Sequence, residues 1–455
     1  MTPPPPDRTP APTPASPRGS ARAHDREIWR LALPAFGALV AEPLFLLTDS
    51  AIVGHLGTAP LGGLGVAGQA IGTLVNICIF LAYGTTAAVA RLVGAGRLDQ
   101  AIRQGLDGIW LAVGIGLLVI LAGWPLAPAV VDAFGASAAV SPHAETYLRI
   151  SLFGVPGMLV ALASTGVLRG LQDTRTPLAV SVATFAGNAA LNAAFVYGFH
   201  WGIAGSAWGT VVAQTAGGAV YVATVLRAAH RHGAPLRPDL AGLRAAATAG
   251  VNLVVRTLTL RVVLVAGTVV ATAMGDDEIA AYQVAFQVWW FLALALDAIA
   301  IAGQAITGRC LGAGDAPAAR AATWRMTQWG LVSGTVLGLL LLAVRPWLPA
   351  LFGMAPHVRS LLLSALVVVA VLQVVAGPLF VLDGVLIGAG DMRFLAVAGV
   401  LTTLVFLPAA GAVHLAGGGL VALWLAIGVW MLARLATLAW RAHGEAWLVT
   451  GAVRS

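Results

Sequence analysis

The sequence predicts an all-α protein that crosses a membrane many times, with twelve helices in two six-helix lobes related by pseudo-two-fold symmetry. Of its 455 residues, 59% are hydrophobic and only 10% are charged, whereas a soluble domain carries about 25% charged residues. Apolar stretches of about 18 residues or more recur along the chain, which is the length of a membrane-spanning helix. Such stretches are too long for the roughly 10-residue strands of an outer-membrane barrel.

Six spans are expected in each half. In the first half we place them at 28–54, 60–89, 105–132, 142–167, 176–198 and 202–227. In the second half we place them at 245–273, 279–308, 320–344, 357–387, 394–415 and 418–441. Several exceed the about 20 residues that cross the hydrocarbon core, which tilting accommodates.

The remaining segments divide the chain into parts. Residues 1–27 are polar and rich in proline, which predicts a disordered cytoplasmic tail, and they contain no apolar run typical of a signal peptide. An N-lobe at 28–227 and a C-lobe at 245–441 are expected to be joined by a cytoplasmic linker at 228–244. Residues 442–455 are expected to form a cytoplasmic C-terminal tail.

The arginines predict the orientation. The chain contains no lysine, so all 26 basic residues are arginine. They gather in alternate loops, which hold Arg91, Arg97, Arg103, Arg169, Arg175, Arg227, Arg231, Arg237, Arg244, Arg309, Arg320 and Arg393. Arg149, Arg345 and Arg359 are the exceptions. Because short cytoplasmic loops are rich in basic residues, both termini are expected in the cytoplasm. This topology explains the positive net charge better than nucleic-acid binding does.

The two halves repeat each other in a constant register. Gly94-Ala-Gly96 matches Gly312-Ala-Gly314, and Phe134-Gly135 matches Phe352-Gly353 at the same offset. Because six is an even number of spans, the second half has the same orientation as the first. Parallel repeats of this kind are typical of transporters, with the substrate path between the halves. Without lysine the chain has no GxxxxGK[ST] nucleotide loop, so an ion gradient is the expected source of energy.

Several motifs resemble one transporter family. The stretches LALPAFGALVAEPLFLLTDSAIVGHLG, ARLVGAGRLDQA, LRGLQDTRTP and LDGVLIGAG resemble the multidrug and toxic compound extrusion (MATE) family, and ALDAIAIAGQA points to its DinF-like branch. The resemblance covers about residues 28–442. It implies a two-lobe, V-shaped antiporter, not an enzyme, that exports amphipathic and often cationic compounds by alternating access. Inward flow of H+ or Na+ would drive it, with no cofactor and no bound metal.

The resemblance also implies a coupling site in the N-lobe. The first-helix acid, which is the proposed protonation site in DinF-like relatives, matches Asp49. Asn188 and Asn192 match a pair on the fifth helix, Thr210 matches a sixth-helix threonine, and Tyr147 matches a fourth-helix tyrosine. Some relatives have a second acid at the position of Asn192. With one carboxylate among the matched positions, H+ is favoured over Na+.

The residues themselves support a special role for Asp49. An acid at bilayer depth costs about 2.5–3.5 kcal/mol on insertion scales and usually faces a protein cavity. The equivalent position of the second half is Gly267, so the polar cluster occurs in one half only. A coupling site would have this asymmetry, whereas a packing device could occur in both halves. The alternative is a structural hydrogen-bond acceptor near the membrane surface.

Other intramembrane polar residues are weaker candidates. Glu42 lies two helical turns before Asp49 and shares its face, so it could be a second proton site or a cation-binding acid. Gln69 and Gln287 occupy equivalent repeat positions, which also suits a structural role.

The C-lobe contains a further set of polar residues. Asp297, Gln304 and Asp383 could form a second ion path. Alternatively, Asp297 and Asp383 pair with Arg256 or Arg261 in a structural network.

The expected function is H+-coupled export of small organic compounds from a bacterial cytoplasmic membrane by a monomer. Alternatives left open are Na+ coupling, a flippase for lipids or lipid-linked sugars, and a membrane scaffold or receptor that does not transport. A flippase would have a cationic cavity, whereas most arginines here lie in loops.

Overall fold

The structure, a computed structural model, describes residues 17–453. All regular secondary structure in this range is helical. Eleven of the described spans are long and apolar enough to cross a membrane, and a bent helix pair makes a twelfth. The all-α fold and the number of spans are therefore confirmed.

The first half contains α1 to α8. Their bounds are α1 Pro17–Gly54, α2 Thr58–Ile77, α3 Phe80–Gly94, α4 Leu98–Ala133, α5 Ser141–Leu152, α6 Val155–Gly170, α7 Arg175–Ala193, the π-helix η1 Ala194–Gly198 and α8 Gly202–His232. Helices α2 and α3 together form the second span. The fourth span is the pair α5 and α6, which are bent by 51° relative to each other. Pro156 lies at the start of α6. Proline is tolerated there because the first N–H groups of a helix have no intrahelical partner.

The second half contains α9 to α15. Their bounds are α9 Leu240–Met274, α10 Asp276–Gly312, α11 Ala316–Val344, the short α12 Leu348–Leu351, α13 Pro356–Gly388, α14 Met392–Leu415 and α15 Leu420–His443. Helix α9 is capped by Asp239, whose side chain accepts a hydrogen bond from the amide of Ala241, as N-cap residues do.

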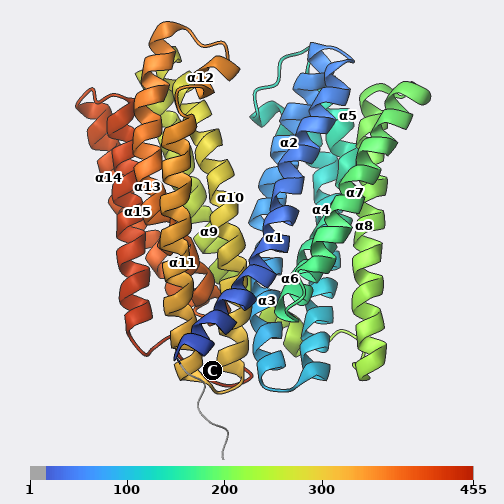
Figure 1. Ribbon diagram of the computed structural model, residues 1–455. Coiled ribbons are helices and arrows are strands. Elements are labelled where there is room, and N and C mark those ends of the chain that lie inside the picture. The colour runs from blue at the N-terminus through green and yellow to red at the C-terminus, as the bar shows by residue number, and fades with distance from the viewer. Residues whose placement is uncertain (1–16, 454–455) are drawn as a thin grey trace, which may run out of the picture.

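Figure 1 shows two bundles, one of α1 to α8 and one of α9 to α15, which converge at the lower end of the view and diverge towards the upper end. The arginine-rich loops lie at the lower end, so the sequence predicts that this end is cytoplasmic. Two apolar clusters lie within the bundle of α1 to α8, and the largest cluster fills the bundle of α9 to α15 and also includes buried residues of α1 and α3. We refer to the bundles as the N-lobe and the C-lobe.

The start of α1 differs from the expected tail. Residues 1–16 lie outside the described part, but the chain is helical from Pro17 rather than disordered up to residue 27. The first turns of α1 lie against the C-lobe before the helix crosses to the N-lobe (Figure 1). The carboxylate of Asp25 accepts hydrogen bonds of 2.7 Å from Arg325 and from the indole of Trp329, and Glu27 pairs with Arg309 at 2.7 Å. These contacts hold α1 against the C-lobe at residues 25 and 27.

The two lobes touch at the end of the first repeat motif. A Cβ atom at Gly94 of α3 would overlap the carbonyl oxygen of Arg309, and a Cβ atom at Gly312 of α10 would overlap the carbonyl oxygen of Arg91. Gly94 and Gly312 are equivalent positions of the two repeats, as are Arg91 and Arg309. The repeat therefore produces a symmetric backbone contact that only glycine permits.

The C-terminal residues close the same end. The Trp447 side chain is completely buried in the C-lobe core, and the amide of Gly451 donates to the carbonyl of Leu311 at 2.9 Å. From the N-lobe, the Arg91 guanidinium donates to the carbonyl of Val449 at 2.7 Å and to that of Gly451 at 3.0 Å. It also donates to the carbonyl of Ala389, at the end of α13, at 2.9 Å. Residues 444–453 thus bridge both lobes.

Candidate functional site

A buried carboxylate lies at the centre of a polar cluster in the N-lobe. The Asp49 side chain is 3% exposed. Its Oδ1 accepts hydrogen bonds of 2.7 Å from the Asn192 amide and 2.7 Å from the Ser206 hydroxyl. Its Oδ2 accepts a hydrogen bond of 3.2 Å from the Tyr147 hydroxyl. Helices α1, α5, α7 and α8 each supply one residue.

The fifth span places two amides on one face. Asn188 and Asn192 are four residues apart in α7, so they project from the same side of the helix, and both are completely buried. The π-helical turn η1 begins two residues after Asn192, and π-helical segments occur frequently at functional sites. The Tyr197 hydroxyl of this turn donates to the carbonyl of Ile52 at 2.9 Å, which ties the turn to α1 just beyond Asp49.

Asn188 and Thr210 extend the cluster by one step. The Asn188 amide donates to the Thr210 hydroxyl at 3.0 Å, and no hydrogen bond joins either of them to Asp49 among the described residues. Ser206 is the residue that the sequence analysis missed. It lies four residues before Thr210, so it shares the face of α8 that carries Thr210; that spacing was a usable signal.

Two amide oxygens of this cluster, Oδ1 of Asn188 and Oδ1 of Asn192, are buried and have no hydrogen-bond partner among the described residues. The second of these lies directly against the backbone of α8. A Cβ atom at Gly209 would overlap it. Glycine at this position is therefore what allows the Asn192 amide to lie between α8 and the carboxylate.

The arrangement of donors is suited to an ionised carboxylate. Three side-chain groups donate to Asp49, and hydrogen bonds to the charged form favour that form, while burial opposes it. When Asp49 takes up a proton, one donor must become an acceptor. The hydroxyl groups of Ser206 and Tyr147 can do so by rotation, whereas Asn192 must turn its amide so that Oδ1 faces the proton. Protonation can therefore change which helices are held together.

The other N-lobe candidates lie outside this network. Glu42 is exposed and makes no ion pair or hydrogen bond with another described residue. Gln69 in α2 is exposed, as is its repeat counterpart Gln287 in α10. The structure does not bring these three side chains to Asp49.

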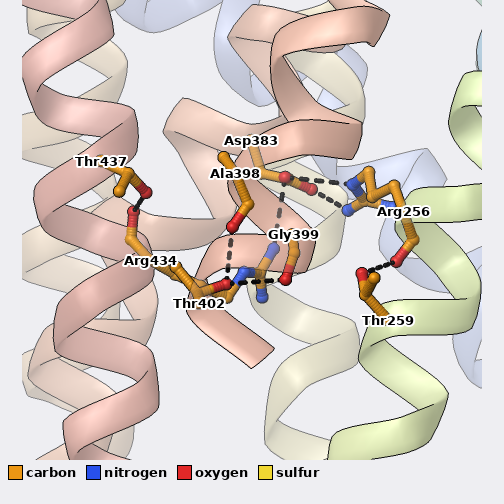
Figure 2. A network of polar contacts seen from close by, with 8 residues as sticks. All are labelled: Arg256, Thr259, Asp383, Ala398, Gly399, Thr402, Arg434 and Thr437. Atoms are coloured by element: carbon orange, nitrogen blue, oxygen red, sulfur yellow. Dashed lines mark hydrogen bonds and ion pairs between the residues drawn. The ribbon is translucent and has the colours of Figure 1, made fainter. Parts of the chain in front are cut away.

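Asp383 belongs to a separate network in the C-lobe, shown in Figure 2. Its carboxylate, from α13, pairs with the guanidinium of Arg256 from α9 and, at 3.3 Å, with that of Arg434 from α15. All three side chains are largely buried, and the Arg434 guanidinium also lies 5.2 Å from the centre of the Trp430 ring. This geometry favours the structural interpretation of Asp383.

The remaining C-lobe candidates are not part of a continuous chain of contacts. Asp297 is half-buried and has no ion-pair partner within 4.0 Å in the described part. Gln304 is 1% exposed, and its Oε1 lacks a described partner. Arg261 donates to the side-chain oxygen of Asn76 at 3.3 Å rather than to an acid. Within the described residues no three His, Cys, Asp or Glu side chains are grouped to hold a metal ion.

Comparison with known proteins identifies the family. The sequence profile of the MatE family matches residues 34–194 and 244–413. The chain is 31% identical over 434 residues to the DNA damage-inducible protein F of Escherichia coli K12, covering 92% of each chain. It is 30% identical over 435 residues to DETOXIFICATION 44, chloroplastic, of Arabidopsis thaliana, covering 91% of this chain and 81% of the relative.

The fold is shared with solved structures. The bent form of the MATE transporter VcmN from Vibrio cholerae superimposes with a TM-score of 0.85 at 22% identity, covering 94% of this chain and 98% of that one. The profile match covers both lobes, and the Escherichia coli relative spans nearly the full length of this chain. This protein therefore belongs to the MATE family and is a DinF-like multidrug efflux transporter rather than an enzyme.

Proposed function

We propose that the protein exports organic cationic or amphipathic compounds in exchange for H+, and that Asp49 carries the proton. The observation that supports this most strongly is the buried Asp49 carboxylate, which accepts hydrogen bonds from three side-chain donors. The word detoxification in the name of the Arabidopsis relative supports export of organic compounds. We further propose that the protein works in a bacterial cytoplasmic membrane with both termini inside, as the arginine distribution predicts.

The choice of H+ over Na+ rests on the side-chain atoms that face Asp49. A cation requires oxygen lone pairs that converge on it, as the unwound carbonyls of transporters provide. Here the amide nitrogen of Asn192 and two hydroxyl groups donate to the carboxylate. A proton needs one acceptor and one partner that can reverse its role, and Ser206 and Tyr147 both can.

In the proposed cycle, the outward-open protein takes up a proton on Asp49. The donors around it rearrange, and the hydrogen bonds that join Asp49 to α7 and α8 weaken. Pro34 and Pro43 lie inside α1, where proline removes a backbone hydrogen bond and permits a bend. Bending of α1 would then release the exported compound, and return of the lobes to the other state would release the proton inside.

The test is the variant Asp49→Asn in proteoliposomes. We expect it to fold, to bind substrate and to lose both pH-gradient-driven export and the proton release that substrate addition causes. Asp132→Asn, which alters an exposed acid of the same lobe, should behave as the wild type. Export by Asp49→Asn at the wild-type rate would refute the proposal. Export that depends on Na+, and stops when choline replaces it at fixed pH, would refute H+ coupling specifically.

A further inference from the structure

A groove of about 570 Å³ lies at the lower end of the C-lobe, between the first turns of α9 and α14. It is separate from the Asp49 cluster, which lies in the N-lobe. Its polar lining comprises Arg244, Thr248 and Asn252 of α9 and Arg393 of α14. The site is at the end of the molecule where the arginine-rich loops lie, which is the predicted membrane–cytoplasm boundary.

The groove carries two positive charges that no described acid neutralises. Arg244 and Arg393 are exposed, and neither guanidinium group forms an ion pair or a hydrogen bond with another residue of 25–453. The acids nearest to them in sequence are engaged elsewhere. Asp239 pairs with Arg103 at 3.2 Å, and Asp391 pairs with Arg441 at 2.7 Å.

An apolar strip continues from each arginine into the membrane-spanning part. On α9, Val251 and Leu258 follow Arg244 at intervals of seven residues, so all three share one helix face, and the two apolar side chains are 62% and 44% exposed. On α14, Val397 and Leu404 follow Arg393 by four and eleven residues, and they are 52% and 58% exposed. The same faces therefore offer cations at the boundary and hydrocarbon above it.

We propose that this groove binds an anionic phospholipid. Its phosphate pairs with the guanidinium groups of Arg244 and Arg393, and the Asn252 amide offers a hydrogen bond to the headgroup, whereas the Thr248 hydroxyl donates to the Arg244 carbonyl at 2.8 Å. Its acyl chains lie along the exposed strips of α9 and α14. Basic pockets between helices at the cytoplasmic surface have this chemistry, and arginine suits phosphate because its planar fork donates two parallel hydrogen bonds.

The experiment compares three probes on the full chain in neutral detergent: dioctanoylphosphatidylglycerol, dioctanoylphosphatidylcholine and inorganic phosphate. Bound lipid is counted by native mass spectrometry, and the unfolding temperature is recorded during titration. The test variant is Arg244→Gln with Arg393→Gln. The control is Arg227→Gln with Arg231→Gln. It removes the same charge from exposed positions near the C-terminal end of α8.

We expect the wild type and the control to bind phosphatidylglycerol and to unfold at a higher temperature in its presence. The test variant should bind it about thirtyfold more weakly, since each basic residue near an anionic membrane surface contributes roughly fivefold. Equal binding by the test variant and the control would overturn the site. Equal binding of phosphatidylcholine would overturn its charge selectivity, and the same stabilisation by inorganic phosphate would show that a free anion rather than a lipid occupies it.

Discussion

At the scale of single residues, the N-lobe site is a carboxylate held by hydrogen-bond donors. These donors differ in how easily they can become acceptors. Hydroxyl groups rotate at little cost, whereas the Asn192 amide is confined between Asp49 and the backbone of α8. Its position depends on the absence of a side chain at Gly209. We therefore infer that Gly209 is a positioning residue, which acts on Asp49 through Asn192.

The variant Gly209→Ala tests this dependence. The added methyl group would overlap Oδ1 of Asn192, so the amide must move away from Asp49. Overpacking of this kind costs about 1–3 kcal/mol. We expect substrate-driven proton release to fall about tenfold or more in proteoliposomes, together with a lower unfolding temperature.

The matched control is Gly187→Ala on the facing helix α7, where a Cβ atom would meet no atom within 4 Å. This variant should transport as the wild type does and should be no less stable, because alanine is the better helix former. If Gly209→Ala also retains full proton release, the position of the Asn192 amide does not matter for coupling.

At the scale of helices, the C-lobe joins α9, α13 and α15 through buried charges. Two guanidinium groups share the Asp383 carboxylate (Figure 2), so the three residues together carry one positive charge. Removing one partner from a buried pair leaves a charge without compensation, which is more costly than the pair itself is stabilising. The network therefore affects folding of the C-lobe more than it affects ion coupling.

The variant Asp383→Asn should lower the free energy of unfolding by about 3–5 kcal/mol, because Arg256 and Arg434 lose their shared counter-ion. The effect is measured as a lower unfolding temperature in detergent. Asp297→Asn is the matched change in the same lobe, and it breaks no ion pair within the described residues, so its effect should be much smaller. A stable Asp383→Asn protein that has lost proton coupling would instead identify Asp383 as part of an ion path.

Much of this element-level organisation could be predicted from the sequence. Hydrophobic length identified the spans, and the constant register of the repeat identified the two halves, because both signals are local or periodic. The partner of Asp383 could not be selected in this way. Arg434 lies in the last span and Arg256 in the first span of the C-lobe, and only packing brings them to one carboxylate.

The candidate site, too, could be predicted only in part. Asp49, Asn192 and Tyr147 are brought into hydrogen-bonding contact, whereas Thr210 reaches Asn188 instead. Ser206 was missed because a serine in a helix that also contains glycine and alanine gives no hydropathy signal. Glu42 shares a face with Asp49 by spacing, but two turns along a helix that contains Pro43 separate their surroundings.

At the scale of the whole molecule, the lower end is held shut by contacts that cross between the lobes. These are the glycine contact between α3 and α10, the first turns of α1 on the C-lobe, and residues 444–453 under Arg91. Alternating access requires the lobes to separate here when the upper end closes. Each contact therefore adds to the stability of the state that is closed at the lower end, and none can survive fully in the other state.

The variant Arg91→Ala should shift this equilibrium towards opening of the lower end. It removes three hydrogen bonds to carbonyl groups, and loss of about 2 kcal/mol changes the ratio of two states by about thirtyfold. Spin labels at Gln100 of α4 and Ala321 of α11, both exposed, report the distance between the lobes after both native cysteines have been replaced. We expect a longer-distance population in Arg91→Ala.

Arg97→Ala provides the comparison, since Arg97 is an exposed arginine in the turn that follows α3, the helix whose last turn carries Arg91. The Arg97 side chain makes no hydrogen bond with the C-terminal residues that are described. The distance distribution should then match that of the wild type. An unchanged distribution in Arg91→Ala would mean that the remaining contacts, at Gly94 and Gly312 and at the start of α1, suffice to keep the lower end shut.

The bridging C-terminus has a practical consequence for anyone who purifies or images this transporter. A fluorescent protein or affinity tag attached after Ser455 would be tethered close to Gly451, whose amide donates to Leu311 at the junction of the lobes. Such a bulky group could bias the transport cycle while leaving expression normal. Fusion at the opposite terminus keeps the whole segment before Pro17 between the tag and the start of α1, so transport rates are best compared between N-terminally tagged and tag-free protein.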